Sequence, residues 1–462
     1  MEYYPARRTT ARFAGCPTRA AGTLFGMSNL FAARAQMAVS LGFHIIFAEI
    51  GIGMPAMMLL AEWRALRSGD TGYAELARRW AKGVAILFAV GAVSGTVLSF
   101  ELGLLWPGFM RLAGAIVGIP FSLEGFAFFT EAIFLGVYLY ARDRIAPGAR
   151  IVAAAIVAAS GAASAVFVVM VNAWMNAPAG VVLVNGRIVA VDAVAGMESA
   201  AALAQALHMV LAAYASTGLA VAGIHAVMLL RGAQPRFHSR ALRVALAIGA
   251  PAALLQPLSG DLSARVVAQT QPVKLAALEG QFDTERGAPL RIGGWPDEVA
   301  RRTRFALEIP RGLSLAAYHD ANAEVKGLNA FPRRDWPPVA PVHAGFQVMV
   351  ALGTAMAFVS AWCAWVALRR REIEANRALL RALVAIAPFG FFATEAGWIV
   401  TEVGRQPWIV QGLQRTSEAV TPMPGLVVPF TVFTVLYVGL GAIVVALIGP
   451  MVRDTHGEAP HA

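Results

Sequence analysis

The chain contains a succession of apolar runs that are long enough to cross a lipid bilayer. A transmembrane helix needs about 20 predominantly apolar residues. About nine runs of suitable length occur, at residues 36–60, 80–105, 121–141, 151–175, 203–230, 241–258, 342–368, 379–403 and 426–451. Only 14% of all residues are charged, against about 25% in soluble domains. The sequence therefore predicts an all-α, polytopic membrane bundle of about nine transmembrane helices with one long extramembrane loop.

The apolar runs also divide the chain into segments. Residues 1–29 form a polar, Arg-rich tail that lacks the apolar core of a secretory signal, so Met27 is a candidate for the true start. Residues 30–258 hold the first six predicted spans. One long polar loop follows at residues 259–341, then three further spans within residues 342–451 and a short tail at residues 452–462.

Basic residues are distributed unevenly between the connecting loops, and this distribution predicts the orientation. They cluster after the first, third, fifth and seventh spans, at Arg64, Arg67, Arg78, Arg79, Lys82, Arg142, Arg144, Arg150, Arg231, Arg236, Arg240, Arg369, Arg370, Arg371 and Arg377. Cytoplasmic loops carry this excess. We therefore expect the N-terminus and the long loop outside and the C-terminus inside. The net charge of +10 then requires no nucleic-acid partner.

Polar side chains within the predicted spans are candidates for function, because an ionisable group is costly inside a bilayer. Most of those singled out here fall in the outer halves of their spans, namely His44, Glu124, Glu131, His208, Met349 and Glu402. His and Met pairs hold low-spin haem iron, while a single protein ligand leaves a position open for oxygen. Four possible iron ligands at similar depth, His44, His208, Met349 and Glu402, thus suggest haem.

Other interpretations of these residues remain open at this point. A membrane histidine often bonds a neighbouring helix, and a methionine often only packs. Glu402 is equally well explained as an ion-site carboxylate or as a structural partner of Arg405. A secondary transporter also gathers polar groups near broken helices.

Residues 395–408, EAGWIVTEVGRQPW, resemble the signature of subunit I of the cytochrome bd quinol oxidases, and residues 404–408 are its most specific part. Further pieces with the same resemblance follow the order of the family, at residues 36–44, 123–131, 172–178 and 274–279. Together they extend over nearly the whole chain, from about Leu30 to Met451. Several motifs in a fixed order are far more specific than any one of them.

This resemblance implies a haem-containing subunit of a terminal respiratory oxidase in the bacterial inner membrane, which oxidises quinol at the periplasmic side and reduces O2 to water. His208 and Met349 would hold a low-spin haem b. Glu402, with Trp398 beside it, would hold a high-spin haem b. His44 would hold a third haem, d or b. Which of the two high-spin haems His44 and Glu402 each serve stays open.

The resemblance also implies the remaining site residues and the partners. Arg405 would pair with a haem propionate, because a guanidinium fork fits a carboxylate. Lys274 and Glu279 would bind and deprotonate quinol in the loop of residues 259–341. Five residues apart, they require a local turn to meet. Glu124 and Glu131 would lie on a proton route near the oxygen site. The expected partners are a second polytopic subunit (subunit II), ubiquinol or menaquinol, O2 and membrane lipid.

The sequence departs from the family pattern at two places. Gln347 stands two residues before Met349, where family members often carry Arg. The loop of residues 259–341 is also short. Both features resemble the cyanide-insensitive branch, some relatives of which carry a b haem instead of haem d. The alternatives to an oxidase are a related membrane haem protein that only transfers electrons and, further away, a transporter that uses the buried carboxylates.

Overall fold

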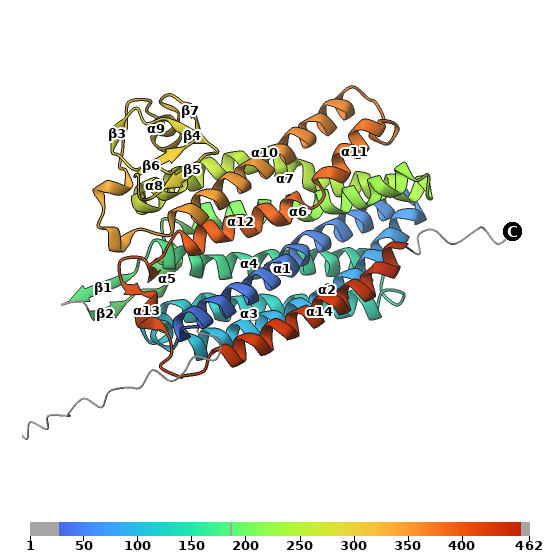
Figure 1. Cartoon of the computed structure of the whole chain (residues 1–462). Coiled ribbons are helices and arrows are strands. Elements are labelled where there is room, and N and C mark those ends of the chain that lie inside the picture. The colour runs from blue at the N-terminus through green and yellow to red at the C-terminus, as the bar shows by residue number, and fades with distance from the viewer. Residues whose placement is uncertain (1–26, 185–186, 454–462) are drawn as a thin grey trace, which may run out of the picture.

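The computed structural model describes residues 27–184 and 187–453, and most of them form a bundle of long helices (Figure 1). Among these residues, nine helices are long and apolar enough to cross a membrane. They are α1 (Asn29–Ser68), α2 (Thr71–Leu105), α3 (Pro107–Tyr140), α4 (Pro147–Asn176), α6 (Ala202–Leu230), α7 (Pro235–Thr270), α10 (Val339–Leu368), the pair α11 (Arg377–Ile386) and α12 (Phe389–Val403) counted as one, and α14 (Val427–Arg453). The predicted all-α membrane bundle of about nine spans is confirmed.

Several helices differ in extent from the apolar runs that predicted them. Helix α7 continues past Leu258 to Thr270, into the stretch assigned to the loop, because a helix does not end where hydropathy falls. The run 379–403 is interrupted between α11 and α12 at Pro388, which lacks an amide hydrogen and restricts the preceding residue. The parts of the predicted tails at residues 1–26 and 454–462 lie outside the described residues.

Small strands and short helices gather at one end of the bundle, which we call the loop end (Figure 1). The segment between α7 and α10 holds α8 (Pro272–Glu279), α9 (Gly312–Tyr318), two 3-10 turns (Leu328–Ala330 and Arg333–Asp335) and six strands. The strands are β3 (Glu285–Arg286), β4 (Leu290–Ile292), β5 (Trp295–Asp297), β6 (Arg302–Arg304), β7 (Leu307–Ile309) and β8 (Glu324–Val325), and they pair antiparallel as β3–β8, β4–β7 and β5–β6. The polar composition of this segment predicts a loop and none of these strands.

Two further connections complete the loop end. Helix α4 is followed by the hairpin β1 (Val181–Val184) and β2 (Arg187–Val191) and by α5 (Ala193–Met197). Helix α12 is followed by β9 (Trp408–Val410), β10 (Gln414–Arg415) and α13 (Thr416–Ala419). At the opposite end, here the far end, lie the connections α1–α2, α3–α4, α6–α7 and α10–α11 (Figure 1), the last with a 3-10 turn at Ile373–Ala375.

Helices α6 and α7 approach each other closely at a pair of glycines. A Cβ placed on Gly218 would lie 2.5 Å from the Cα of Gly249, and a Cβ on Gly249 would lie 2.9 Å from the Cα of Gly218. No side chain fits between two backbones at that distance. This contact sets the spacing of α6 and α7 at the centre of the main apolar core.

We expect Gly249→Val to destabilise the protein by about 1–3 kcal/mol, because overpacking forces the two backbones apart. Thermal unfolding of the purified protein in detergent measures this. Gly114→Val is the matched control, because a Cβ on Gly114 meets nothing within 4 Å. Equal unfolding temperatures for the two variants would contradict the tight glycine contact.

Candidate functional site

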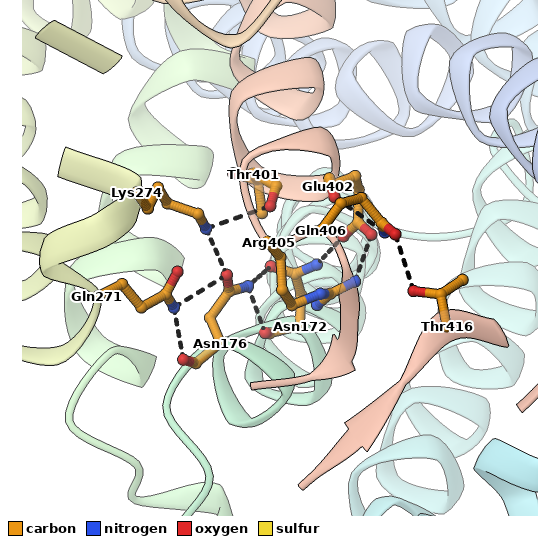
Figure 2. A network of polar contacts seen from close by, with 9 residues as sticks. All are labelled: Asn172, Asn176, Gln271, Lys274, Thr401, Glu402, Arg405, Gln406 and Thr416. Carbon is orange, nitrogen blue, oxygen red and sulfur yellow. Dashed lines mark hydrogen bonds and ion pairs between the residues drawn. The ribbon is translucent and has the colours of Figure 1, made fainter. Parts of the chain in front are cut away.

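The end of α12 brings a carboxylate and a guanidinium together below the loop end. Helix α12 ends at Val403 with Gly404 as its cap, as the sequence predicts. In the last turn of α12, Glu402 accepts hydrogen bonds from the Arg405 guanidinium and from the Asn172 amide of α4 (Figure 2). The Arg405 side chain is 2% exposed and that of Glu402 is 30% exposed, so the guanidinium is buried and the carboxylate half-buried. The structure therefore agrees with the alternative in which Glu402 is a structural partner of Arg405.

A continuous chain of hydrogen bonds joins Glu402 to Lys274 of α8 (Figure 2). The Lys274 Nζ donates to Asn176 Oδ1 at 2.6 Å and to the Thr401 carbonyl at 3.2 Å. The Asn176 Nδ2 donates to Asn172 Oδ1 at 2.9 Å, and Asn172 donates to Glu402. Two asparagines one turn apart on α4 therefore link the buried Lys274 to the carboxylate of the Glu402–Arg405 ion pair.

The sequence alone indicates no role for these two asparagines, although they lie within the family-like stretch at residues 172–178. The available signal was the spacing of Asn172 and Asn176 by four residues, which places them on one helix face. Gln271 supports them, since its amide donates to the Asn176 carbonyl at 2.5 Å and to Asn176 Oδ1 at 3.1 Å. Polar side chains that complete one another in this way are typical of a site that must be held rigidly.

Lys274 and Glu279 both lie in α8 and are both 3% exposed. Burial, with a smaller contribution from Arg405, lowers the pKa of Lys274 to about 7, although Glu402 opposes the shift. Burial raises the pKa of Glu279 to about 8 against the opposing charge of Arg291. Both groups therefore change charge near neutral pH, which suits proton transfer.

The predicted local turn between Lys274 and Glu279 is wrong, because α8 is a regular helix through both residues. Lys274 contacts Asn176 and Thr401, whereas the charged neighbour of Glu279 is Arg291. The two groups thus border the loop segment at different points along α8. A substrate that uses both must extend between them.

Two of the predicted iron ligands are histidines that each place Nδ1 against a serine hydroxyl. The Nδ1 of His44 lies 2.9 Å from the Ser94 hydroxyl, and the Nδ1 of His208 lies 2.9 Å from the Ser259 hydroxyl. Each hydroxyl donates its own hydrogen to a backbone carbonyl. Each serine therefore accepts from Nδ1–H, which leaves the lone pair of Nε2 available.

Glycines lie beside both histidine rings. A Cβ on Gly95 would lie 3.0 Å from His44 Cε1, and one on Gly260 would lie 3.6 Å from His208 Cε1. The amide nitrogen of Gln256 lies 3.2 Å from His208 Nε2 and must give way to an iron ligated there. Glycine at both positions leaves the rings the room that a bulkier residue would take.

Met349 belongs to α10, which packs against α12 and α7. A Cβ on Gly397 of α12 would lie 3.1 Å from the Met349 sulfur. Helix α6, which carries His208, packs against α7 as well. Trp398 is half-buried one turn before Glu402. The structure thus gathers the predicted ligands on adjoining helices.

Glu124 and Glu131 both face α4, as expected for residues two turns apart on one helix. The Ser164 hydroxyl of α4 donates to Glu124 at 3.3 Å. Glu131 is buried, and its carboxylate oxygens lie 3.2 Å from the position that a Cβ on Gly161 of α4 would take. The pair lines the interface between α3 and α4.

Gln347 forms two hydrogen bonds that the sequence does not indicate. Its Oε1 accepts from the Gly293 amide at 2.9 Å, and its Nε2 donates to the Arg291 carbonyl at 3.0 Å. One turn earlier, the His343 ring nitrogens lie 2.7 Å from the Leu278 carbonyl oxygen and 3.1 Å from that of Gly293. Helix α10 therefore anchors the segment of β4 and β5 against the end of α8.

The residues present fit haem. Arg405 keeps two buried nitrogens, Nε and Nη1, without a hydrogen-bond partner among the described residues, and a further carboxylate such as a haem propionate would satisfy them. His44 and His208 present unprotonated Nε2 atoms, and Met349 and Glu402 complete a set of soft and hard iron ligands.

Comparison with known proteins decides the family. The sequence model described as "Cytochrome bd terminal oxidase subunit I" matches residues 32–456. The chain belongs to this family. It is 40% identical over 427 residues to the "Putative cytochrome bd menaquinol oxidase subunit I" of Bacillus subtilis, covering 91% of this chain and 95% of that protein. It is 31% identical to the "Cytochrome bd ubiquinol oxidase subunit 1" of the same organism, covering 94% and 95%.

A solved structure supports the same family. The fold matches the bd oxidase from Geobacillus thermodenitrificans with a TM-score of 0.87 and 38% identity, covering 92% of this chain and 98% of that chain. The chain is therefore a multi-pass membrane subunit of a haem-containing terminal quinol oxidase, an enzyme that functions with a second subunit and with quinol. The two alternatives, a haem protein without oxidase activity and a transporter, find no support.

Asn176→Leu should weaken this site, because it keeps the branched shape of the side chain but leaves the Lys274 ammonium with one partner fewer. An unsatisfied buried polar group costs about 1–3 kcal/mol, so we expect a lower unfolding temperature and a higher KM for quinol. Asn329→Leu, at an exposed loop position that bonds Asp283, is the control. An unchanged KM for quinol in the Asn176 variant would show that Asn176 does not contribute to quinol binding.

Proposed function

We propose that this subunit oxidises quinol against Lys274 and Glu279 and reduces O2 to water near His44 and Glu402. The observation that carries the proposal is the buried hydrogen-bond chain from Lys274 through Asn176 and Asn172 to Glu402. It ties the residue that resembles the family's quinol ligand to the residue that resembles its haem ligand.

The same proposal assigns the haems. His208 and Met349 hold a low-spin haem b. Glu402, with Trp398 beside it, holds a high-spin haem b, and His44 holds the third haem, d or b. Bound haem supplies one-electron transfer and, where one iron position stays open, oxygen reduction. The serine-fixed tautomers of both histidines support the ligand roles.

The chain's own residues handle the protons of quinol oxidation. Quinol releases two protons with its two electrons, so a base is needed beside it. Glu279 accepts a proton at its carboxylate, and its pKa of about 8 lets it release that proton again near neutral pH. Lys274 donates a hydrogen bond to a quinol oxygen. Asn172 and Asn176 have amides that do not titrate, so they position Lys274 and Glu402 instead of conducting protons.

The topology of the helices gives the direction in which protons move. We place the N-terminus and the loop end in the periplasm and the C-terminus in the cytoplasm of a bacterial inner membrane. The Arg-rich connections α1–α2, α3–α4, α6–α7 and α10–α11 all lie at the far end (Figure 1), which fits the cytoplasmic excess of basic residues. Quinol protons then leave at the loop end. Protons for water reach the oxygen site past Glu131 and Glu124, so charge crosses the membrane.

The finer identity of the substrate and of the third haem belongs to the same proposal. Ubiquinol and menaquinol both fit, since the two Bacillus relatives are named for one each. The quinol loop comprises residues 259–341, of which α7 occupies the first part. Gln347 in place of Arg supports the cyanide-insensitive-like branch and therefore a third haem that is d or b.

His208→Ala should remove the low-spin haem b band from the reduced-minus-oxidised spectrum of the purified oxidase, because the iron loses an axial ligand. Extraction of the pigments with mass analysis then counts the haems that remain. His319→Ala, at an exposed histidine in the loop segment, is the control. If the low-spin band survives in the His208 variant, another residue is the axial ligand of this haem.

Quinol oxidation should rise as the pH rises through about 8, because Glu279 must lose its proton before it can act as a base. Glu279→Gln should lower quinol-dependent oxygen uptake about 100-fold and flatten this limb of the pH profile. Glu324→Gln, exposed in the same segment, is the control. Loss of haem from the Glu279 variant would argue against a quinol role.

A further inference from the structure

Two carboxylates in the interior of the bundle have no role in the scheme above. Glu49 of α1 is 1% exposed, and its carboxylate lies beside the hydroxyls of Thr394 and Ser216. Glu395 of α12 has one buried oxygen, Oε1, without a hydrogen-bond partner among the described residues. The two lie close enough to interact by charge. Neither group is explained by an ion pair.

Close helix packing brings the two carboxylates together. A Cβ on Gly53 of α1 would lie 2.4 Å from the Thr217 Cβ of α6, and one on Gly390 of α12 would lie 2.4 Å from the Ser216 Cα of α6. On the other side, Glu395 Oε2 lies 3.2 Å from the position of a Cβ on Gly42. Backbone contacts of this kind allow α1, α6 and α12 to meet around one small polar site.

The groups that face Glu49 are hydroxyls, apart from Glu395. Ser216 and Thr394 lie beside its carboxylate, and the Thr217 hydroxyl donates to the Glu49 backbone carbonyl at 3.0 Å. These side chains cannot neutralise a charge. Two neighbouring carboxylates without a cation cannot both ionise cheaply in a bilayer. The pair therefore retains a proton.

The position of the pair relates it to the proposed oxygen site. Glu49 follows His44 by five residues on α1, about 7.5 Å along the helix. Glu395 precedes Glu402 by seven residues on α12, about 10 Å along that helix. Since α1 runs from the loop end and α12 runs toward it, both displacements are toward the far end. The pair lies on the side from which protons for water are expected.

We propose that Glu49 and Glu395 form a shared proton-holding pair that delivers protons to the oxygen-reducing site. The proposal rests on the haem-ligand roles of His44 and Glu402 given above. Reduction of O2 to water takes one proton for each electron. In each delivery a carboxyl O–H bond breaks, its proton ends in product water, and the electron comes from quinol. A proton from the far end then restores the carboxyl group.

This site is distinct from the pair of carboxylates on α3. Glu124 and Glu131 face α4, whereas Glu49 and Glu395 lie between α1, α6 and α12. The break between α11 and α12 at Pro388 comes six residues before Thr394. Broken helices inside membranes are tolerated where they border protein interior or water, so the break offers polar backbone on the far-end side of the pair.

The test uses the complete two-subunit oxidase and four variants. Redox-difference infrared spectroscopy detects the C=O band of a protonated carboxyl group. Glu49→Gln and Glu395→Gln should each remove or shift the same band, and each should lower quinol-dependent oxygen uptake about 100-fold with full haem content. Glu49→Asp should restore part of both signals. The double variant should be no slower than either single variant, because the two groups act as a unit.

Glu101→Gln is the matched control, because Glu101 is another buried carboxylate in a span but is bonded by Gln36 and Ser40 at 2.9 and 2.8 Å. It should leave the band and the oxygen uptake at the wild-type level. Wild-type spectra and uptake in Glu49→Gln with full haem content would overturn the proposal and leave the haem assignments intact. A wrong assignment of His44 or Glu402 appears separately, as an unchanged pigment spectrum in His44→Ala or Glu402→Ala.

Discussion

The ion pair of Glu402 and the buried Arg405 is the interaction on which the arrangement of the loop end depends. The Arg405 side chain is 2% exposed and that of Glu402 is 30% exposed. A buried polar group without a partner costs about 1–3 kcal/mol or more, so the guanidinium must be held against the carboxylate. Asn172 of α4 also donates to this carboxylate. The ends of α4, α8 and α12 are consequently fixed relative to one another by polar contacts, where apolar packing alone would allow them to slide.

This constraint also affects Lys274. Burial lowers the pKa of Lys274 most, Arg405 lowers it further, and Glu402 opposes the shift. The result is a lysine that changes charge near neutral pH while its position is set by Asn176 and Thr401. In the proposed function, quinol meets a donor held by Asn176, which is hydrogen-bonded to the Asn172 that holds the carboxylate of the proposed haem ligand.

The sequence predicts those features that arise from local chemistry. Hydropathy finds the spans, and Gly404 marks the end of α12. The contact between Asn172 and Glu402 could not be predicted, because residues 230 positions apart share no periodic signal. The helical path of α7 through residues 259–270 was missed because polarity there was taken for a loop. The short strands between α7 and α10 cannot be predicted in this way, because they form by pairing with another strand of the segment and not from a sequence pattern of their own.

Glu395 shows how much a tertiary contact adds to a motif. From the sequence alone, Glu395 is only a second acid on the helix of Glu402. Its carboxylate neighbour, Glu49, lies on the first helix and forms part of no motif. Because α12 carries Glu395 and Glu402 two turns apart, a movement of this helix as a rigid unit would shift both residues relative to Glu49. In the proposed scheme, the iron ligand and the proton-holding pair are therefore linked through one short helix that begins at a proline break.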